Sequence, residues 1–396
     1  MKNNIEVGDI FRRYGDLYLE AHGGAMPLRQ HKTMSAIRAC RTGNLGGHVD
    51  ECNHCGELRI SYNSCRNRHC PKCQSLDKER WLEARKKEVL PVSYFHVVFT
   101  IPDSLRSLAL RNQKIIYDIL FKSVAETIKE LTRDTKHLGA ETGFIAILHT
   151  WTQALIDHPH IHCIVPGGGL SLGGKAWISC KKDYFITVQV ISRLFKGKFL
   201  FYLKEAFKAD ELYLGGSLTD LKKHKGFKNL LDRLYNKEWV IYCKPPFRNA
   251  DTVIEYLGRY THRVAISNDR IISLKHGKVS IRYRDSGDGD KTKYMSLDAF
   301  EFIRRFLLHV LPDQFMKIRY YGILSNRNRK EKLLKCRKIL DCVPKTDEVE
   351  KKECWENLLL RLTGVDPRVC PKCKQGRMRA REMLCKEKSC RSPPDT

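Results

Sequence analysis

The chain has 396 residues, with 72 lysines and arginines against 45 aspartates and glutamates, a formal net charge of +27. An excess this large favours a polyanionic partner such as nucleic acid. No apolar run approaches the roughly 20 residues that a membrane-spanning helix needs, and no basic leader precedes an apolar stretch. We therefore expect a cytoplasmic protein without membrane contact. Its sixteen cysteines then indicate metal ligands or core thiols rather than disulfides.

Residues 40–73 are dense in zinc-type ligands. The pairs Cys52–Cys55 and Cys70–Cys73 are separated by fourteen residues, and this spacing, close to that of a zinc ribbon, predicts that they share one structural Zn²⁺. Candidates for a second site are Cys40, His48, Cys65 and His69, although small buried core residues are the alternative for the two cysteines. Arginines and lysines among these ligands favour DNA recognition, and we expect residues 1–90 to form a helical lead-in and a zinc-binding module.

The next elements alternate between helix and strand. Residues 75–90 have the mixed charges of an exposed helix, and residues 93–101 are a β-rich run that ends at a proline. Residues 104–135 carry apolar side chains at helical spacing and predict one long amphipathic helix. Residues 143–151 then predict a strand that leads toward a pair of histidines.

His160 and His162 lie one residue apart in an apolar run that ends at three glycines. Side chains at i and i+2 share one face of a strand, so the two imidazoles are expected to project together. Such a pair is half of a divalent-metal site, and a wet strand face with two surface histidines is the alternative. Gln153 is a candidate third ligand through its amide oxygen, or a polar strand end.

Tyr256 and Tyr260 are four residues apart in a predicted helix, so they share one of its faces. An aromatic core stripe is the more common role of such a pair. Arg259, His262 and Arg263 make these surroundings polar and basic, and we expect them to contact DNA.

Further cations follow on predicted strands. Lys275 and Arg282 belong to the exposed face of a hairpin that turns at 276–277, and Arg319 begins a basic strip with interleaved aromatic residues. This pattern suits single-stranded DNA, because bases stack on aromatic rings while cations hold phosphates. A lone pair, Cys370–Cys373, predicts a second zinc site near the end of the chain, which Cys385 and Cys390 would complete.

A tyrosine phenol beside a divalent ion permits one particular reaction. The phenol is a weak nucleophile, with a reference pKa of about 10, but an ion can polarise a phosphate and offset charge on the leaving 3′ oxygen. The products are a 5′-phosphotyrosine bond and a free 3′ hydroxyl. Histidine ligands with an open position suit Mg²⁺ or Mn²⁺ during turnover.

Five motifs together resemble the transposases of the insertion-sequence-91 type, which are two-tyrosine, rolling-circle members of the His-hydrophobic-His (HUH) nuclease superfamily. The motifs begin at Cys65, Tyr94, His158, Tyr256 and Tyr320, and the resemblance runs in order to about residue 326. It implies a bacterial enzyme that cleaves single-stranded DNA at transposon ends through a phosphotyrosine intermediate. Carried over, His160 and His162 are metal ligands, and Tyr256 and Tyr260 are nucleophiles.

The resemblance also implies an α+β fold, with a central antiparallel sheet, flanking helices and the histidine strand in the middle. Residues 91–326 would form this core, and residues 327–396 a basic helical C-terminal region. A plasmid or phage replication initiator or relaxase is the alternative enzyme, and a zinc-dependent DNA-binding protein is the non-enzymatic one. Host replication proteins and further copies of the chain on DNA are partners that the sequence leaves open.

Overall fold

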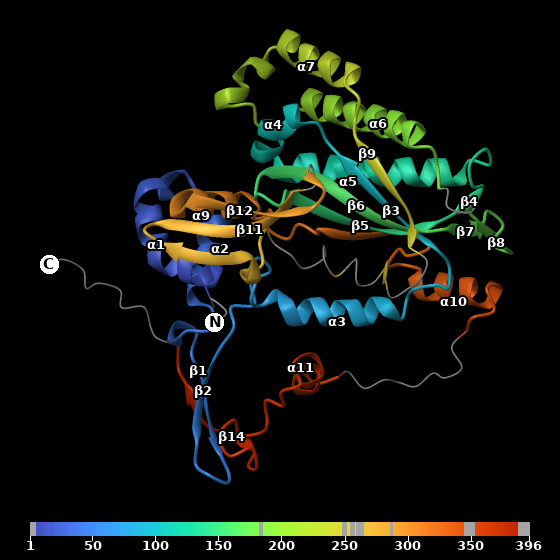
Figure 1. Ribbon diagram of the computed structural model, residues 1–396. Helices are drawn as coiled ribbons and strands as arrows, with labels where there is room; N and C mark the ends of the chain where they lie inside the picture. Colours follow the sequence, from blue (N-terminus) through green and yellow to red (C-terminus); the bar gives the residue numbers. More distant parts are fainter. Residues whose placement is uncertain are drawn as a thin grey trace.

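The computed structural model describes residues 5–181, 185–247, 252–253, 258, 265–285, 288–343 and 353–386. Its centre is a five-stranded antiparallel sheet in the order β13-β5-β6-β3-β9 (Figure 1). The histidine strand β6 is the middle strand, as predicted. In chain order, the five strands are β3 (Tyr94–Thr100), β5 (Gly143–Trp151), β6 (Asp157–Pro166), β9 (Ile241–Phe247) and β13 (Ile318–Gly322).

One face of this sheet forms the largest apolar core. Alternate side chains such as Phe99, Leu148 and Ile161 are buried there in the same cluster as residues of α5 (Gln113–Arg133) and α6 (Val188–Lys208). In Figure 1 these helices lie over the sheet, and α7 forms a further layer. The smaller elements around this core are α4 (Arg106–Arg111), α7 (His224–Asn236), β4 (Ala140–Glu141), β7 (Gly168–Ser171) and β8 (Trp177–Ser179).

The opposite face of the sheet carries the histidines and a smaller apolar cluster. Ile147 and Ile164 belong to it together with residues of α3 (Gln74–Lys86) and α10 (Arg329–Ile339). Val253 is buried in the same cluster. The backbone of Gly258 lies close to α3 as well, since a Cβ there would meet Leu82 at 2.8 Å.

A third core joins distant parts of the chain. Helices α1 (Val7–His22) and α2 (Leu28–Ala39) pack with α9 and a three-stranded sheet, as in the edge-to-face contact of Phe11 with Phe306. The partners of α1 and α2 are β10 (Ile271–Lys275), β11 (Lys278–Asp285), β12 (Lys291–Asp298) and α9 (Ala299–Leu308). The domain boundaries expected at residues 90 and 326 stay a prediction, but this core contains residues from both sides of the first one.

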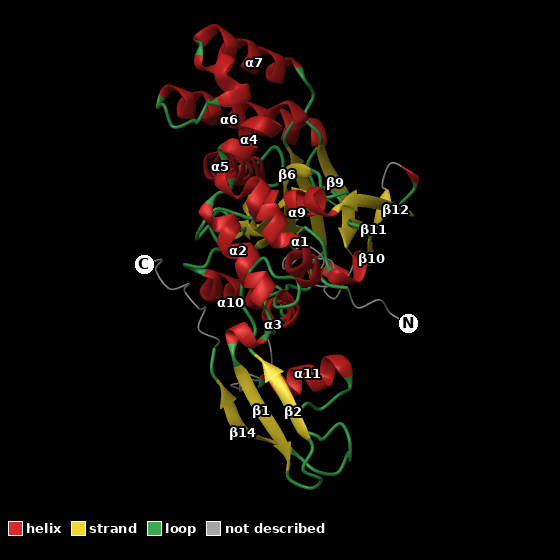
Figure 2. Cartoon of the chain, turned by 90° about the vertical axis from the view of Figure 1, so that its left-hand side faces the viewer, coloured by secondary structure: helices red, strands yellow, loops and turns green. Residues whose placement is uncertain are grey.

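A second small sheet joins the two ends of the chain. Strand β1 (Gly47–Cys52) pairs with β2 (Leu58–Tyr62) on one side and with β14 (Met378–Leu384) on the other, both antiparallel. Figure 2 shows these strands projecting from the rest of the molecule beside α11 (Trp355–Thr363). None of the helices that the structure describes has the length and apolar character required to cross a bilayer.

The mixed α+β class with antiparallel sheets is confirmed, and one local prediction is corrected. The helix expected over residues 104–135 is broken at Asn112, whose side chain donates to the carbonyl of Tyr213 and accepts from its N–H. Strand β9 runs through Pro245 and Pro246 to Phe247. Prolines are tolerated there because β9 is an edge strand and its register with β3 shifts at that point.

Candidate metal centres and a cationic cleft

Three histidines converge at the end of the central strands. His149 on β5 lies directly opposite His160 on β6, and His162 follows two residues later on the same face. One ring nitrogen of each lies within 4.8 Å of the others. The ring centroids of His149 and His162 are 4.5 Å apart, and those of His160 and His162 are 4.8 Å apart. This is the geometry of a three-nitrogen metal site with open coordination positions.

Burial keeps the β6 histidines neutral. Loss of water around the ring lowers the pKa of His160 to about 4 and that of His162 well below its usual range. Neighbouring histidines lower the pKa of His162 further. A neutral imidazole has one nitrogen lone pair free for coordination, so both rings are in the protonation state that a metal requires.

Hydrogen bonds fix which nitrogen faces the site. Nδ1 of His160 lies 2.6 Å from the carbonyl oxygen of His158 and donates to it, which leaves Nε2 as the acceptor. Nδ1 of His162 lies 2.8 Å from Nε2 of His96 on β3. With Nε2 of His162 as the ligand atom, its Nδ1–H donates to His96. Such outer contacts orient metal-ligating histidines in general.

The sequence interpretation missed His149 and His96. Gln153, the predicted third ligand, lies in the exposed turn between β5 and β6, where its backbone carbonyl accepts from the Arg270 guanidinium. His149, rather than Gln153, lies within 4.8 Å of the ring nitrogens of His160 and His162. The alternation of β5 was the available signal, since it places His149 and Trp151 on one face of the strand. The register with β6 shifts between these two residues, so the spacing alone does not show that His149 lies opposite His160.

The predicted nucleophiles Tyr256 and Tyr260 lie outside the described residues, as do Arg259, His262 and Arg263. Their described neighbours Val253 and Gly258 lie on the histidine-bearing side of the sheet, in or against the cluster that contains Ile147. Ile147 is the residue directly opposite His162.

The cysteines form two groups of four, and the predicted pairing is wrong. Cys70 and Cys73 join Cys40 and Cys65, whereas Cys52 and Cys55 join Cys370 and Cys373. Within the first group, Sγ–Sγ distances are 3.5 Å for Cys40–Cys73, 3.6 Å for Cys65–Cys73 and 3.7 Å for Cys40–Cys70. A tetrahedral zinc with bonds of about 2.3 Å separates its sulfurs by about 3.8 Å. The two knuckles therefore fit two ions rather than one, because β1 and β2 carry the first knuckle away from the second.

Three other predicted ligands that the structure describes are not in these groups, and a fourth is outside the described residues. Both ring nitrogens of His69 are engaged by the fold, Nε2 accepting from the Leu311 N–H at 3.1 Å and Nδ1 lying 3.2 Å from Asn67. His48 instead lies 3.5 Å from Asp50. Cys385 is exposed and outside both groups, and Cys390 lies outside the described residues.

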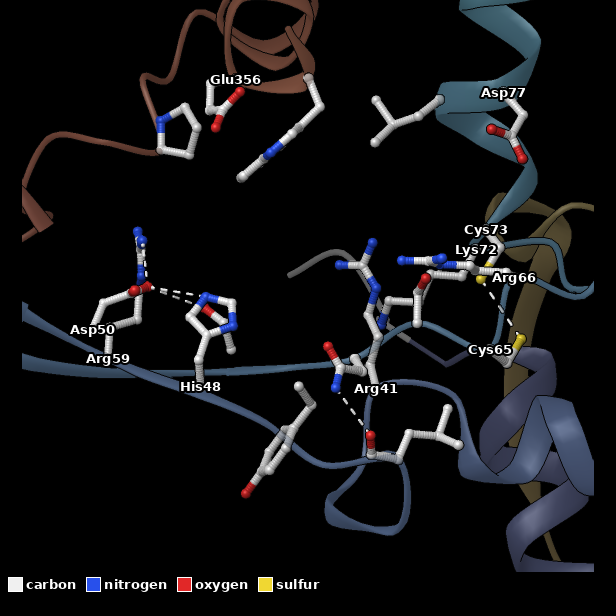
Figure 3. A pocket seen from close by; sticks show the side chains of 18 of the residues that line it. Arg41, His48, Asp50, Arg59, Cys65, Arg66, Lys72, Cys73, Asp77 and Glu356 are labelled. Atoms are coloured by element: carbon white, nitrogen blue, oxygen red, sulfur yellow. Dashed lines mark hydrogen bonds and ion pairs between the residues drawn. The ribbon is translucent and has the colours of Figure 1, made fainter. Parts of the chain in front are cut away.

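A large cleft of about 1350 Å³ separates the β1–β2–β14 sheet from α3 and α11 (Figure 3). Its lining is rich in cations, and acidic side chains are fewer. Within the residues that the structure describes, four of the cations have no ion pair or side-chain hydrogen bond, namely Arg41, Arg66, Arg80 and Lys386. Three others are paired with acids, namely Arg59, Lys72 and Arg368.

Arg41 and Arg66 occupy unusual positions in this cleft. Each directly follows a cysteine of the first group, and each has a left-handed backbone, with φ of 56° and 51°. Glycine adopts a positive φ at a lower conformational energy than arginine does. The backbone conformation therefore does not explain an arginine at either position, whereas the side chain in the cleft does. Figure 3 shows both guanidinium groups on the same side of the cleft. Tyr62 and Trp355 add partly exposed aromatic rings to the lining.

The other residues predicted to contact DNA differ in how far their side chains are exposed and how far they are engaged by the fold. Lys275 is exposed at the end of β10, and Arg282 on β11 lies 3.8 Å from Asp269. Arg319 is part of the fold, because it lies over the Phe121 ring and pairs with Asp118 at 2.5 Å.

Two family models match the chain. One described as "Transposase zinc-binding domain" matches residues 10–101, and one described as "Putative transposase" matches residues 143–332. The chain is 48% identical over 378 residues to "Putative transposase y4qJ" of Sinorhizobium fredii (strain NBRC 101917 / NGR234), covering 95% of both proteins. It is 26% identical to the transposase for insertion sequence element IS801 of Pseudomonas savastanoi pv. phaseolicola, over 78% of this chain and 73% of that protein. No solved structure matches. With the zinc-binding domain, the histidine-bearing core and this extent of identity, the chain belongs to the transposases of the insertion-sequence-91 type.

Proposed function

We propose that this transposase nicks and rejoins single-stranded DNA at transposon ends by tyrosine attack, with a divalent ion held by His149, His160 and His162. The observation that carries the proposal is the convergence of three ring nitrogens on adjacent central strands. Neutral rings and fixed outer hydrogen bonds support a site prepared for a metal. Mg²⁺ or Mn²⁺ suits the role, since either supplies Lewis-acid polarisation of a phosphate oxygen.

The nucleophiles in this proposal are Tyr256 and Tyr260. Val253 and Gly258, which lie in the same segment of chain, support it because they are on the histidine-bearing side of the sheet. The tyrosine oxygen forms a bond to phosphorus as the bond from phosphorus to the 3′ oxygen breaks. The phenol loses its proton and the 3′ oxygen gains one, so the products are a 5′-phosphotyrosine and a 3′ hydroxyl. Rejoining reverses these bonds and needs no ATP.

The cleft beside the first cysteine group is the surface that we propose for recognition of the element's ends. Its four unpaired cations suit phosphates, and the rings of Tyr62 and Trp355 suit stacking with unpaired bases. This assignment gives the zinc-binding module of the first 90 residues its DNA-recognition role. Rolling-circle transfer to a target strand is the overall process that the two tyrosines would serve.

The test is formation of a covalent adduct. The full-length chain is incubated with Mn²⁺ and single strands that carry each end of its element, and the products are separated on a denaturing gel. We expect a protein–DNA band that is lost after protease treatment and that requires the divalent ion. A free 3′ hydroxyl on the released strand should support extension by a polymerase. Cleavage without an adduct would reject the tyrosine mechanism.

A further inference from the structure

The group Cys52, Cys55, Cys370 and Cys373 joins two segments that lie 315 residues apart in the sequence, counted from Cys55 to Cys370. The family models that match the chain cover residues 10–101 and 143–332, so the second segment belongs to neither. We propose that these four thiolates hold a second structural Zn²⁺, which fastens the C-terminal segment to the N-terminal zinc-binding module.

The sulfur geometry fits a tetrahedral ion. Cys52 Sγ lies 3.7 Å from Cys373 Sγ, and Cys55 Sγ lies 3.7 Å from Cys370 Sγ. These distances are close to the 3.8 Å or so between sulfurs around zinc, and far longer than the roughly 2.05 Å of a disulfide. All four atoms are within 4.8 Å of one another, so one ion can reach them all.

The two knuckles have nearly the same backbone. In each, the first cysteine carbonyl accepts from the residue after the second cysteine, Gly56 in one and Lys374 in the other, at 3.1 Å. Both of those residues are left-handed, with φ of 69° and 59°. Backbone N–H groups donate to Cys52 Sγ and Cys373 Sγ at 3.4 Å. Such N–H···S contacts stabilise a thiolate, which is the form that binds zinc.

Close packing between the knuckles favours glycine at position 376. A Cβ built there would lie 2.4 Å from Cys52 Sγ and 2.6 Å from the Cβ of His54. The knuckles are further linked by the ion pair of Lys372 with Glu57 at 2.7 Å and by the Asn53 N–H, which donates to the Arg377 carbonyl at 3.1 Å. These contacts hold the two segments together beside the four sulfur atoms.

The small sheet has little else to hold it together. On β2, Leu58 and Ile60 are more than half exposed, and the described residues of β14 are exposed or only partly buried. None of the side chains of β1, β2 or β14 belongs to the three apolar clusters formed by the described residues. A sheet this small without an apolar core generally requires a metal or disulfides to fold. Zinc at the four thiolates supplies that stabilisation.

The experiment measures zinc per chain on the full-length protein by mass spectrometry under native conditions. We expect two Zn²⁺ in the wild type and one in the variant Cys370→Ser/Cys373→Ser. The variant Cys52→Ser/Cys55→Ser should also retain one. The decisive sample combines all four substitutions: it should still hold one ion, because both pairs serve the same site.

Cys342→Ser/Cys354→Ser is the matched control, since these described C-terminal cysteines lie outside both groups, and it should keep two ions. Replacement of zinc by Co²⁺ gives a second readout, a tetrathiolate spectrum whose intensity should halve in either double variant. Retention of two ions by Cys370→Ser/Cys373→Ser would overturn the proposal. Loss of both ions in the four-cysteine variant, with circular dichroism showing that the helices remain, would also overturn it. None of these readouts depends on DNA cleavage.

Discussion

His96 meets His162 edge to edge, with the ring planes 7° apart, the ring centroids 5.1 Å apart and 2.8 Å between Nε2 of His96 and Nδ1 of His162. Burial lowers the pKa of His96 to about 3, so it is a neutral acceptor at physiological pH. The two residues lie on the adjacent strands β3 and β6, so their hydrogen bond connects a histidine of the candidate metal site to β3. This relationship makes His96 a positioning residue for a ligand rather than a ligand.

The first prediction concerns that hydrogen bond. His96→Phe keeps an aromatic ring beside His162 but removes the acceptor nitrogen, and we expect Mn²⁺ affinity to fall about 10- to 100-fold. Titration calorimetry on the full-length chain measures it. His224→Phe, at an exposed position of α7, is the control and should bind normally. Unchanged affinity in His96→Phe would show that His162 needs no support from β3.

The second prediction separates the two candidates for the third ligand. His149→Ala should reduce Mn²⁺ affinity at least tenfold, because one of three converging nitrogens is removed. Gln153→Ala should bind within twofold of the wild type, since Gln153 lies in the exposed turn. The reverse result would restore the ligand suggested by the sequence and reject the histidine triad. Calorimetry with the same preparations decides between them.

The third prediction tests the nucleophiles. Tyr256→Phe/Tyr260→Phe should abolish the covalent adduct while DNA affinity stays within about twofold, because only the phenolic oxygens are lost. Tyr294→Phe, an exposed tyrosine on β12, is the matched control and should form the adduct at the wild-type rate. Gel analysis with labelled DNA reports the adduct, and fluorescence anisotropy reports affinity. An adduct in the double variant would place the attacking oxygen elsewhere.

The fourth prediction concerns the strained arginines of the cleft. The variant Arg41→Gly/Arg66→Gly should have a free energy of unfolding about 1 kcal/mol higher per site, because glycine accepts a positive φ. It should therefore unfold at a higher urea concentration. The same variant should bind single-stranded element ends more weakly. Its salt dependence should fall by about 0.7 in log–log slope for each phosphate contact removed.

Two controls accompany the arginine variant. Lys208→Gln removes a charge on α6, where Lys208 pairs with Glu205, and it should change neither stability nor DNA binding appreciably. Zinc content should be unchanged in the arginine variant, which would show that the two guanidinium groups are not needed to neutralise the nearby thiolates. Weaker DNA binding together with zinc loss would instead give these arginines a structural role.

The fifth prediction is a pH dependence. Burial raises the pKa of Asp157 from an ordinary value of 3.8 to about 7, although Arg106 opposes the shift. The folded state thus holds the proton longer than the unfolded state does. The free energy of unfolding should fall as the pH rises from about 4 to 7. Above pH 7, ionisation of the buried carboxyl lowers it by on the order of 4 kcal/mol relative to its value below pH 4.

Asp157→Asn removes this titration. The variant should be more stable than the wild type at pH 8, and the advantage should shrink at pH 5.5, where the wild-type carboxyl is mostly protonated in the folded chain. Urea unfolding at both pH values measures the difference. An equal difference between the two chains at both pH values would mean that Asp157 titrates normally.

Local patterns in the sequence predicted much of this architecture. The alternation around His160 and His162 was enough to place both on one face of a strand, and the hairpin turn at 276–277 appears where glycine follows histidine. His149 was missed because its position depends on the register between two strands, which a bulge shifts. Sequence spacing cannot reveal such a shift, since it depends on how the turn residues pack.

The cysteines show the same limit at longer range. Spacing identified the knuckles at Cys52, Cys70 and Cys370 but paired the first two with each other. The structure separates them because Arg68, two residues before Cys70, donates to the carbonyls of Pro312 and Phe315 and so holds the second knuckle to the core. The first knuckle lies at the turn of the β1–β2 hairpin, where it meets the C-terminal strand β14.

The pairing of β1 with β14 sets an order of events during synthesis. Strand β1 is synthesised long before β14, so that edge of the sheet lacks its partner until residues 378–384 have been made. A chain released before Cys370 would lack both β14 and the knuckle of Cys370 and Cys373. A gene copy truncated before the codon for Cys370 would thus encode the histidine-bearing core without the strand that pairs with β1 and without the two thiols that join Cys52 and Cys55.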